Sequence, residues 1–314
     1  MKDIRIVFMG TPDFAATILK HLIDNKYNVV GVITAADKPA GRGRKINQSA
    51  VKKYAVSQNL PILQPTNLKD EAFQEDLKGW NANLQIVVAF RMLPKSVWSL
   101  PKYGTFNLHA SLLPDYRGAA PINWAIINGE TKTGVTTFFI DDKIDTGEII
   151  LQSEVAVKDD EIVGELHDRL MLLGANLVGE TVDLIANEDV KTTKQPELEE
   201  KSAPKLYPHN CKIDWSKSLD DVYNHIRGLN PYPAAWTTIS NGEDELTAKI
   251  YGVSKEIIEH DIKSGTIITT KKELKVAVKD GYLIIEQIKI SGKKMMDAQS
   301  LLNGFEFKKE AIML

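Results

Sequence analysis

In the first half of the chain, short continuous apolar runs alternate with stretches of helical spacing. Such runs predict strands at residues 4–9, 29–33 and 84–90. Another strand is predicted at 105–109, and one at 135–140 because its residues are β-branched and aromatic. Continuous apolar runs suit strands that are buried on both faces of a sheet. Helices are predicted between them, one starting with Thr11 as N-cap and Pro12 at the first helical position. This alternation predicts parallel βαβ units, and therefore an α/β domain with a doubly wound, mostly parallel, Rossmann-like sheet.

The pattern then changes to one long helix and a polar segment. Apolar residues over 161–187 recur at helical spacing, which predicts a helix that closes the first domain. The following stretch is rich in Lys, Glu, Thr and Pro and has no apolar periodicity, which is typical of a linker. We expect a first domain over 1–189, a linker over 190–208 and a second domain over 209–314.

The second domain is predicted to be mostly β-structure. One helix is expected over 219–227. Strands are expected at 235–239, 246–251, 265–269, 274–278 and 282–290. Gly, Asn and Asp turns divide these short strands, and this arrangement is typical of a small β-barrel.

Composition narrows the class of protein. The chain has 314 residues, of which 43% are apolar and 26% are charged, as in an ordinary soluble protein. The single cysteine, Cys211, excludes a disulfide framework and a multi-cysteine zinc site. The first residues do not resemble a signal peptide, and we see no apolar run near the roughly 18 residues of a membrane span. We therefore expect a cytoplasmic protein without membrane contact.

Net charge argues against general attraction to nucleic acid. The sum of 39 Lys and Arg with 42 Asp and Glu is −3. A local basic surface is still compatible with that sum. Residues 37–45 form such a surface, because Lys38, Arg42, Arg44 and Lys45 lie together on a glycine-spaced loop. This loop suits phosphate contact, and its alternative is a solvated loop without function.

Polar side chains at the end of one predicted strand are candidate catalytic groups. Asn107 and His109 are two residues apart, so they point to the same face of the strand. They also lie at its carboxyl end, where doubly wound sheets bind ligands. Histidine can transfer protons near neutral pH, and an amide can donate a hydrogen bond to an oxyanion. The alternative is a structural histidine that is hydrogen-bonded at a strand end.

Two glycine-containing turns offer further candidates. The acidic turn 141–148 follows a strand, so it is expected at the same sheet edge as His109, where a carboxylate could orient the imidazole. Its spacing does not match an EF-hand, and a solvated turn is the alternative. The turn Gly10-Thr11-Pro12 has only one of the three glycines of a dinucleotide-binding fingerprint, so dinucleotide binding is disfavoured.

Several short motifs, taken in order, resemble the folate-dependent formyltransferases, and within them the group that acts on methionyl-tRNA. The resemblance runs from Arg5 to near the C-terminus, and its specificity lies in the order and spacing of the motifs. They are FMGTPDF at 8–14, the loop at 38–45, NLHASLLP at 107–114, RGAAPI at 117–122, the strand and Asp-Thr-Gly turn at 134–147, IDW at 213–215 and NPYPAAW at 230–236.

The resemblance implies a formyl-transfer enzyme of translation initiation and one-carbon metabolism. Its formyl donor and co-substrate would be 10-formyltetrahydrofolate, its acceptor the α-amino group of methionyl initiator tRNA, and no metal would be required. The implied catalytic residues are Asn107, His109 and Asp145. The implied folate contacts are Ser111, Leu112, Leu113 and Pro114. The chain departs from the family at Phe90-Arg91-Met92, where Tyr-Gly and an aliphatic residue are usual.

The resemblance also implies the tRNA-binding parts. The basic loop would enter the acceptor stem through Lys38, Arg42, Arg44 and Lys45, with Arg42 as the best single candidate. The C-terminal domain would be an OB-like barrel that holds the tRNA, according to the same resemblance. From their clustering in the sequence alone, Lys271, Lys272, Lys293 and Lys294 are candidate phosphate contacts, and solvated lysines are the alternative. We expect a monomer.

Related enzymes are the nearest alternatives. A sugar-nucleotide N-formyltransferase or a 10-formyltetrahydrofolate hydrolase would share the three catalytic residues, but a small acceptor has no need of the basic loop. A glycinamide ribonucleotide formyltransferase would resemble only one domain. A non-catalytic tRNA- or folate-binding module would not need an amide, an imidazole and a carboxylate at one sheet edge.

Overall fold

The chain forms two compact units. The computed structural model describes residues 2–40, 45–196 and 201–314. Unit 1 comprises Met1–Pro121, Thr133–Val155 and His167–Ser202. Unit 2 comprises Ile122–Lys132, Ala156–Leu166 and Ala203–Leu314.

Two short segments predicted within the first domain therefore cluster with unit 2. Hydrogen bonds join both segments to residues 203–314 of unit 2. The Arg227 guanidinium donates to the carbonyls of Lys158 and Glu161, at 3.1 and 3.0 Å. The indole of Trp124 donates to the carbonyl of Pro204 at 2.8 Å.

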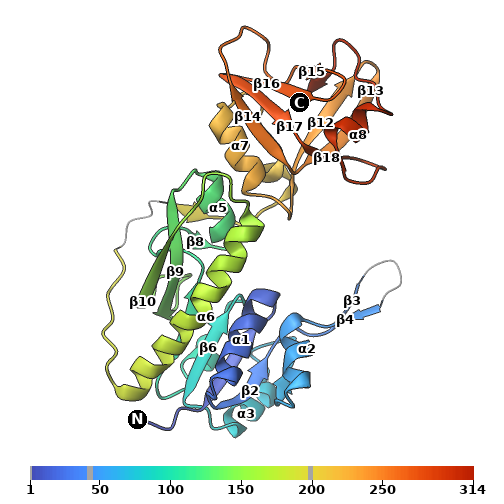
Figure 1. Ribbon diagram of the computed structural model, residues 1–314. Helices are drawn as coiled ribbons and strands as arrows, with labels where there is room; N and C mark the ends of the chain where they lie inside the picture. Colours follow the sequence, from blue (N-terminus) through green and yellow to red (C-terminus); the bar gives the residue numbers. More distant parts are fainter. Residues whose placement is uncertain (1, 41–44, 197–200) are drawn as a thin grey trace. The chain divides into compact units, whose positions relative to one another are not determined.

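Unit 1 is built on a seven-stranded sheet in the order β10-β9-β7-β6-β1-β2-β5 (Figure 1). The strands are β1 (Ile6–Gly10), β2 (Val29–Ile33), β5 (Ile62–Leu63), β6 (Leu84–Val88), β7 (Thr105–His109), β9 (Lys132–Phe139) and β10 (Ile149–Ala156). The strands from β5 to β7 pair in parallel, and β9 is antiparallel to β7. The predicted mostly parallel sheet is confirmed. Because the chain runs outward from β1 to β5 and then returns to β6, the topological switch point lies between β1 and β6.

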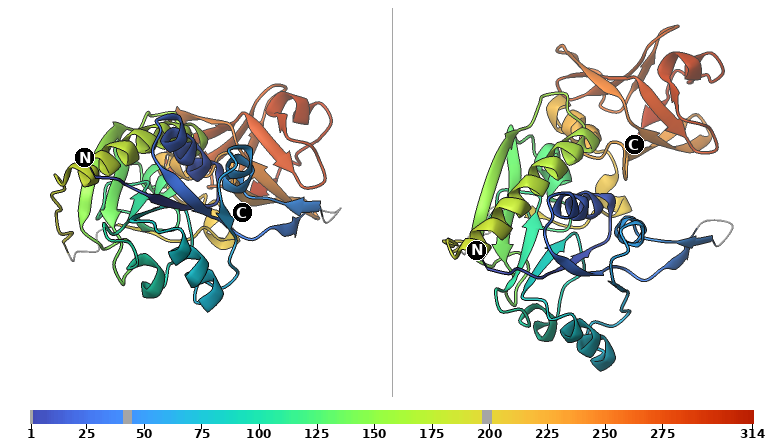
Figure 2. Two further views of the ribbon diagram at one scale, coloured as in Figure 1. Left: turned by 90° about the horizontal axis from the view of Figure 1, so that it is seen from below. Right: turned by 60° about the horizontal axis from the view of Figure 1, so that its bottom comes forward.

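Helices cover both faces of this sheet. They are α1 (Asp13–Asp24), α2 (Ala50–Ser57), α3 (Glu71–Gly79), α4 (Lys95–Trp98), α5 (Pro121–Ile127) and α6 (Val163–Asn187). Val7, Met9 and Val87 share an apolar cluster with residues of α3 and α4. On the other face α1 and α6 lie next to each other, as Figure 1 and Figure 2 show. The strands are thus buried from both sides, which explains their continuous apolar runs.

Two helix predictions are adjusted by the structure. Helix α1 begins at Asp13 with Pro12 as its N-cap, so it starts one residue later than predicted and Thr11 does not cap it. Helix α6 is long and apolar enough to cross a membrane, a property that the sequence analysis did not register. However, 56% of its most apolar window is buried, and Gly174 lies against Leu108 of β7. In this fold α6 is a core helix.

Unit 2 contains two antiparallel sheets. The larger has the order β19-β18-β13-β12-β20 and the smaller β14-β17-β16-β15. Their strands are β12 (Ala235–Asn241), β13 (Asp244–Ile250), β14 (Val253–Ile257), β15 (Ile267–Thr269), β16 (Leu274–Val278), β17 (Gly281–Ile285), β18 (Gln287–Ile290), β19 (Met296–Asp297) and β20 (Ile312–Met313). Unit 2 also contains helices α7 (Leu219–Arg227) and α8 (Ala298–Leu302) and the 3-10 turn η1 (Pro208–Cys211), and α5 clusters with it apart from Pro121.

Residues of both sheets meet in one core. Ile239 and Ile250 of the larger sheet cluster with Val276 and Leu283 of the smaller one. The predicted strand over 282–290 is in fact two strands in different sheets, because the chain changes sheet at Glu286. Strand β14 was not predicted, since its polar residues hide the apolar pattern. Unit 1 also contains two small two-stranded sheets. One pairs β3 (Lys38–Ala40) with β4 (Lys45–Asn47), and the other pairs β8 (Arg117–Gly118) with β11 (Ser202–Ala203), whose last residue is assigned to unit 2.

A buried histidine in α7 predicts a pH-dependent stability. Burial lowers the pKa of His225 because it disfavours the charged imidazolium, and the Cys211 backbone opposes this only in part. The unfolded chain therefore takes up a proton first as the pH falls below the ordinary histidine pKa of about 6.5, and stability falls with it. We expect urea midpoints measured from pH 7 to pH 5 to fall less steeply for His225→Gln than for the wild type. Parallel slopes would contradict this.

Candidate active site

His109 lies at the carboxyl end of β7, beside the switch point of the sheet. Its side chain is buried, and Nε2 lies 2.8 Å from the carbonyl oxygen of Tyr116. A carbonyl only accepts hydrogen bonds, so Nε2 carries the hydrogen in this contact. The other ring nitrogen, Nδ1, lies 3.8 Å from Oδ2 of Asp145, which is longer than a hydrogen bond. Nδ1 is therefore the ring nitrogen that is left for a reacting group, and it carries a hydrogen only when the ring is protonated.

Asp145 reaches His109 from a tight turn between β9 and β10. Its backbone has φ +54°, and its Oδ2 accepts a hydrogen bond from the Gly118 N–H at 3.0 Å. The turn requires glycine two residues later, because a Cβ on Gly147 would lie 1.6 Å from the Phe139 carbonyl oxygen. The carboxylate is thus held close to His109, as predicted, although β9 is antiparallel to β7, so the turn does not follow a parallel strand as the prediction assumed.

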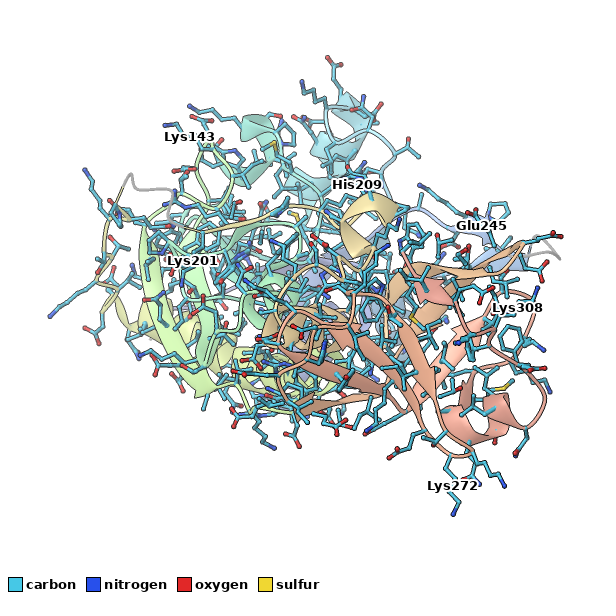
Figure 3. All side chains as sticks on the ribbon, turned by 90° about the horizontal axis from the view of Figure 1, so that it is seen from above. Lys143, Lys201, His209, Glu245, Lys272 and Lys308 are labelled. Atoms are coloured by element: carbon cyan, nitrogen blue, oxygen red, sulfur yellow. The ribbon has the colours of Figure 1, made fainter. Side chains whose placement is uncertain are left out.

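The remaining acids of this turn face outward. Asp141 accepts from the Thr146 hydroxyl at 2.8 Å and from the Lys143 N–H at 2.9 Å, so it organises the turn itself. Asp142 is exposed, and Lys143 stands at the surface in Figure 3. Of the clustered acids, only Asp145 is brought to His109.

Asn107 occupies the same strand and the same face as His109. Its side chain is half-buried. Among the described residues, none forms a hydrogen bond with its amide. The amide can therefore meet a ligand atom without first breaking a contact within the described chain.

The loop 111–114 is held rigidly beside this strand. The Thr136 hydroxyl donates to the Ser111 carbonyl at 2.6 Å and accepts from the Leu113 N–H at 3.2 Å. Gln152 donates to the Leu113 carbonyl at 2.9 Å. Ser111 and Leu113 are buried, and the Ser111 hydroxyl donates to the Asp115 carbonyl. Leu112 and Pro114 are half-buried, and they are the two side chains that this loop presents at its surface.

The predicted basic loop is only partly described. Lys38 is exposed on β3, and Lys45 pairs with Ala40 in β4. Arg42 and Arg44 lie outside the described residues. The base of the ribbon is fixed at Asp37, which binds Lys52 at 2.5 Å and Gln64 at 2.8 Å. The hydrogen bond from Lys52 lowers the pKa of the Asp37 carboxyl, and Gln64 adds to this effect.

Sequence reasoning missed the residues that orient this pair. Tyr116 supplies the carbonyl for His109, and Gly118 supplies the N–H for Asp145. Between them, Arg117 binds Gln195 from the predicted linker. The motif beginning at Arg117 was noted only as part of a family pattern. The one sequence signal for Gln195 is its residue type, because a glutamine amide can donate to one polar group and accept from another at the same time.

Arg91, the departure from the family pattern, has a structural contact. Its Nη1 donates to the Thr66 carbonyl at 2.8 Å and its Nη2 to the Pro65 carbonyl at 2.5 Å. The guanidinium therefore ties the loop after β5 to the loop after β6. Because both loops lie at the carboxyl edge of the sheet, the residue helps to shape that edge.

A cavity of about 570 Å³ lies at the opposite edge of the sheet. It is lined by residues that precede the strands, among them Arg5, Asn83 and Tyr103. None of the predicted catalytic or folate-binding residues lines it. We therefore place the candidate active site at His109 and Asp145.

Comparison with protein families matches nearly the whole chain. Residues 4–182 match the model described as formyl transferase, and residues 205–306 match its C-terminal domain. The methionyl-tRNA formyltransferase of Flavobacterium johnsoniae is 60% identical over 312 residues, covering 99% of both chains. That of Flavobacterium psychrophilum is 59% identical over 314 residues, again covering 99% of both.

Solved structures show the same fold. The sugar 3N-formyl transferase WlaRD, solved in the presence of dTDP and 5-N-formyl-THF, matches with a TM-score of 0.68. The match covers 94% of this chain and 100% of that one, at 21% sequence identity. At this identity the likeness concerns the fold, whereas the far closer sequence relatives indicate which acceptor is used.

Proposed function

The chain belongs to the formyltransferase family, within the methionyl-tRNA formyltransferases, and from this premise we propose how its residues divide the reaction between them. The enzyme transfers the formyl group of 10-formyltetrahydrofolate to the α-amino group of methionine on initiator tRNA. The product is the N-formylmethionyl-tRNA used in translation initiation. The observation that supports our assignment best is the approach of a buried His109 to an anchored Asp145.

Asn107 and His109 stabilise the charge that develops on the formyl oxygen. Attack of the amine on the formyl carbon makes that carbon tetrahedral and its oxygen negative. In our proposal the Asn107 amide and Nδ1–H of a protonated His109 donate hydrogen bonds to this oxygen. Preformed donors of this kind need no reorganisation during the reaction, which is why they accelerate it.

Asp145 supports the charge on His109 and the movement of the proton. Its carboxylate lies on the Nδ1 side of the imidazole, 3.8 Å from Nδ1, so in our proposal its negative charge faces the positive charge of the protonated ring. The new bond joins the amine nitrogen to the formyl carbon, and the bond from that carbon to N10 of the folate breaks. The proton lost by the amine passes to N10, with Asp145 as the relay, directly or through one water.

The folate is proposed to bind along residues 111–114. The half-buried Leu112 and Pro114 offer apolar surface, and the loop is fixed by Thr136 and Gln152. A rigid loop suits a ligand that must hold its formyl group in position for attack. Ser111 and Leu113 are buried, so their contribution would come from the shape and backbone of the loop.

We further propose that unit 2 acts as an OB-like tRNA-binding domain of a monomeric cytoplasmic enzyme. Its larger sheet carries Trp236, Lys249 and Lys289 in one row of directly paired residues. Lys212 extends this row through a bridge to Trp236, with its ammonium 5.6 Å from the ring. Cations beside an aromatic ring suit contact with a nucleic acid. Lys272 is also exposed, at the end of a hairpin in Figure 3.

The basic loop gives a separable prediction for the tRNA. Arg42→Ala should weaken binding of methionyl-tRNA about tenfold and reduce the salt dependence of binding, because one phosphate contact is lost. The affinity for the formyl donor should be unchanged, since the basic loop is not among the proposed folate contacts at residues 111–114. Lys78→Ala, which removes an exposed cation from α3, is the matched control. Binding of tRNA to Arg42→Ala with wild-type affinity and salt slope would leave the loop without a role in recognition.

A further inference from the structure

The catalytic turn is braced by a residue from the segment predicted as a linker. Gln195 lies near the end of residues 190–196, where most side chains are exposed and its own is half-buried. Its Nε2 donates to the carbonyl of Asp145 at 3.0 Å and to the carbonyl of Gly147 at 2.7 Å. Both hydrogens of the amide are thus used on the turn that carries the catalytic carboxylate.

The other end of the same amide faces an arginine. Oε1 of Gln195 accepts from Nη2 of Arg117 at 2.7 Å and from Nε at 3.2 Å. Because guanidinium only donates and carbonyls only accept, these four contacts fix which end of the amide is which. A glutamine can accept from Arg117 and donate to the turn carbonyls at the same time. A glutamate could only accept, and a lysine could only donate.

Gln195 is held in place by its own backbone neighbourhood. Thr193 and Ile149 exchange two backbone hydrogen bonds of 2.9 Å, so the segment is attached to the first residue of β10. The Thr192 hydroxyl donates to the Glu148 carboxylate at 2.5 Å. The segment is therefore part of unit 1, and these contacts fix the backbone that carries the Gln195 side chain.

The turn needs such support because its backbone is unfavourable. Asp145 has φ +54°, a conformation that residues other than glycine adopt infrequently and that the surroundings must hold. Arg117, which donates to Gln195, lies in the chain between Tyr116 and Gly118. The Tyr116 carbonyl contacts His109, and the Gly118 N–H donates to Asp145. One amide thus braces both backbone segments that orient the catalytic pair.

We propose that Gln195 is a positioning residue for formyl transfer, acting through the Asp145 turn. This inference rests on the role assigned to Asp145 above. Without the amide, the 3.8 Å approach of Asp145 to His109 is no longer fixed. Misplacement of a catalytic group by about 1 Å can cost about 100-fold in rate. The ligand-binding surfaces lie elsewhere, so substrate affinity should be spared.

The test compares kcat with KM in three variants of the full-length chain. Gln195→Ala should lower kcat about 10- to 100-fold, with both KM values within about twofold of wild type. Gln195→Glu keeps the acceptor for Arg117 but loses both donors to the turn, so its kcat should fall at least as far. Gln74→Ala is the matched control, because Gln74 also bridges a carbonyl and a hydroxyl, on α3 away from the site. Its kcat should be unchanged.

Three results would overturn the inference. They are a wild-type kcat in Gln195→Ala, an equal loss in Gln74→Ala, or recovery of kcat in Gln195→Glu, which would place the effect on Arg117 alone. Wild type and Asp145→Asn are assayed beside them. If the wild type does not formylate methionyl-tRNA, the proposed function fails; if wild type is active and Asp145→Asn is not, an active Gln195→Ala rejects only the role of Gln195.

Discussion

Asn107→Ala should lower the turnover of formyl transfer about 100- to 1,000-fold at saturating substrates, with little change in folate affinity. The amide is half-buried on the face of β7 that carries His109, and none of the described residues forms a hydrogen bond with it. Its removal therefore costs no internal hydrogen bond within the described chain. What is lost is a donor to an oxygen that is negative only during the reaction, so the loss falls on kcat rather than on KM.

Single-turnover transfer and folate titration together measure this effect. Asn25→Ala is a suitable control, because Asn25 is an exposed asparagine beyond the end of α1 whose side chain binds only a backbone carbonyl. Near-normal turnover of Asn107→Ala would remove this residue from the mechanism. A loss of folate affinity that accounts for the whole effect would assign it to binding instead.

Asp145→Asn should lower turnover about 100- to 10,000-fold, the range typical of a lost acid–base group. The substitution keeps the size of the side chain and an oxygen that can accept from Gly118. It removes the negative charge that faces Nδ1 of His109 at 3.8 Å, and with it the support for a protonated ring. The proton relay between the two nitrogens is lost as well.

The neighbouring acids provide the control for this second prediction. Asp142→Asn changes the same charge in the same turn, but its side chain is exposed and 4.0 Å from Lys95. We expect its turnover to match that of the wild type. Equal losses in the two variants would mean that the charge of the turn matters and not the carboxylate at His109. An active Asp145→Asn would exclude a relay through this residue.

The strands and the catalytic edge could be predicted because their signals are local. A strand buried on both faces is continuously apolar, so the residues of β2 are those predicted. Doubly wound sheets bind ligands at the carboxyl ends of their strands, so His109 at the end of β7 could be predicted as a site residue. The approach of Asp145 to His109 could not be derived from strand ends, because β9 is antiparallel to β7. Their separation depends on turn geometry, which the pattern does not contain.

The missed parts depend on contacts that are distant in sequence. Strand β14 pairs with β17 although it is polar, because its partner strand rather than its own composition fixes it. The bracing amide of Gln195 lies 50 residues from Asp145, within a stretch whose composition is typical of a linker. One of the two segments that join unit 2 is fixed by Arg227 and the other by the contact of Trp124 with Pro204, and no periodicity could reveal these contacts.

The acceptor is identified by formyl transfer from 10-formyltetrahydrofolate by the purified chain, with methionyl initiator tRNA, an amino-sugar nucleotide and water as competing acceptors. Formyl is expected on the methionyl-tRNA, and His109→Ala should abolish this transfer while both substrates still bind. Formyl transfer to the sugar nucleotide, release of formate without transfer, or an active His109→Ala would contradict this expectation.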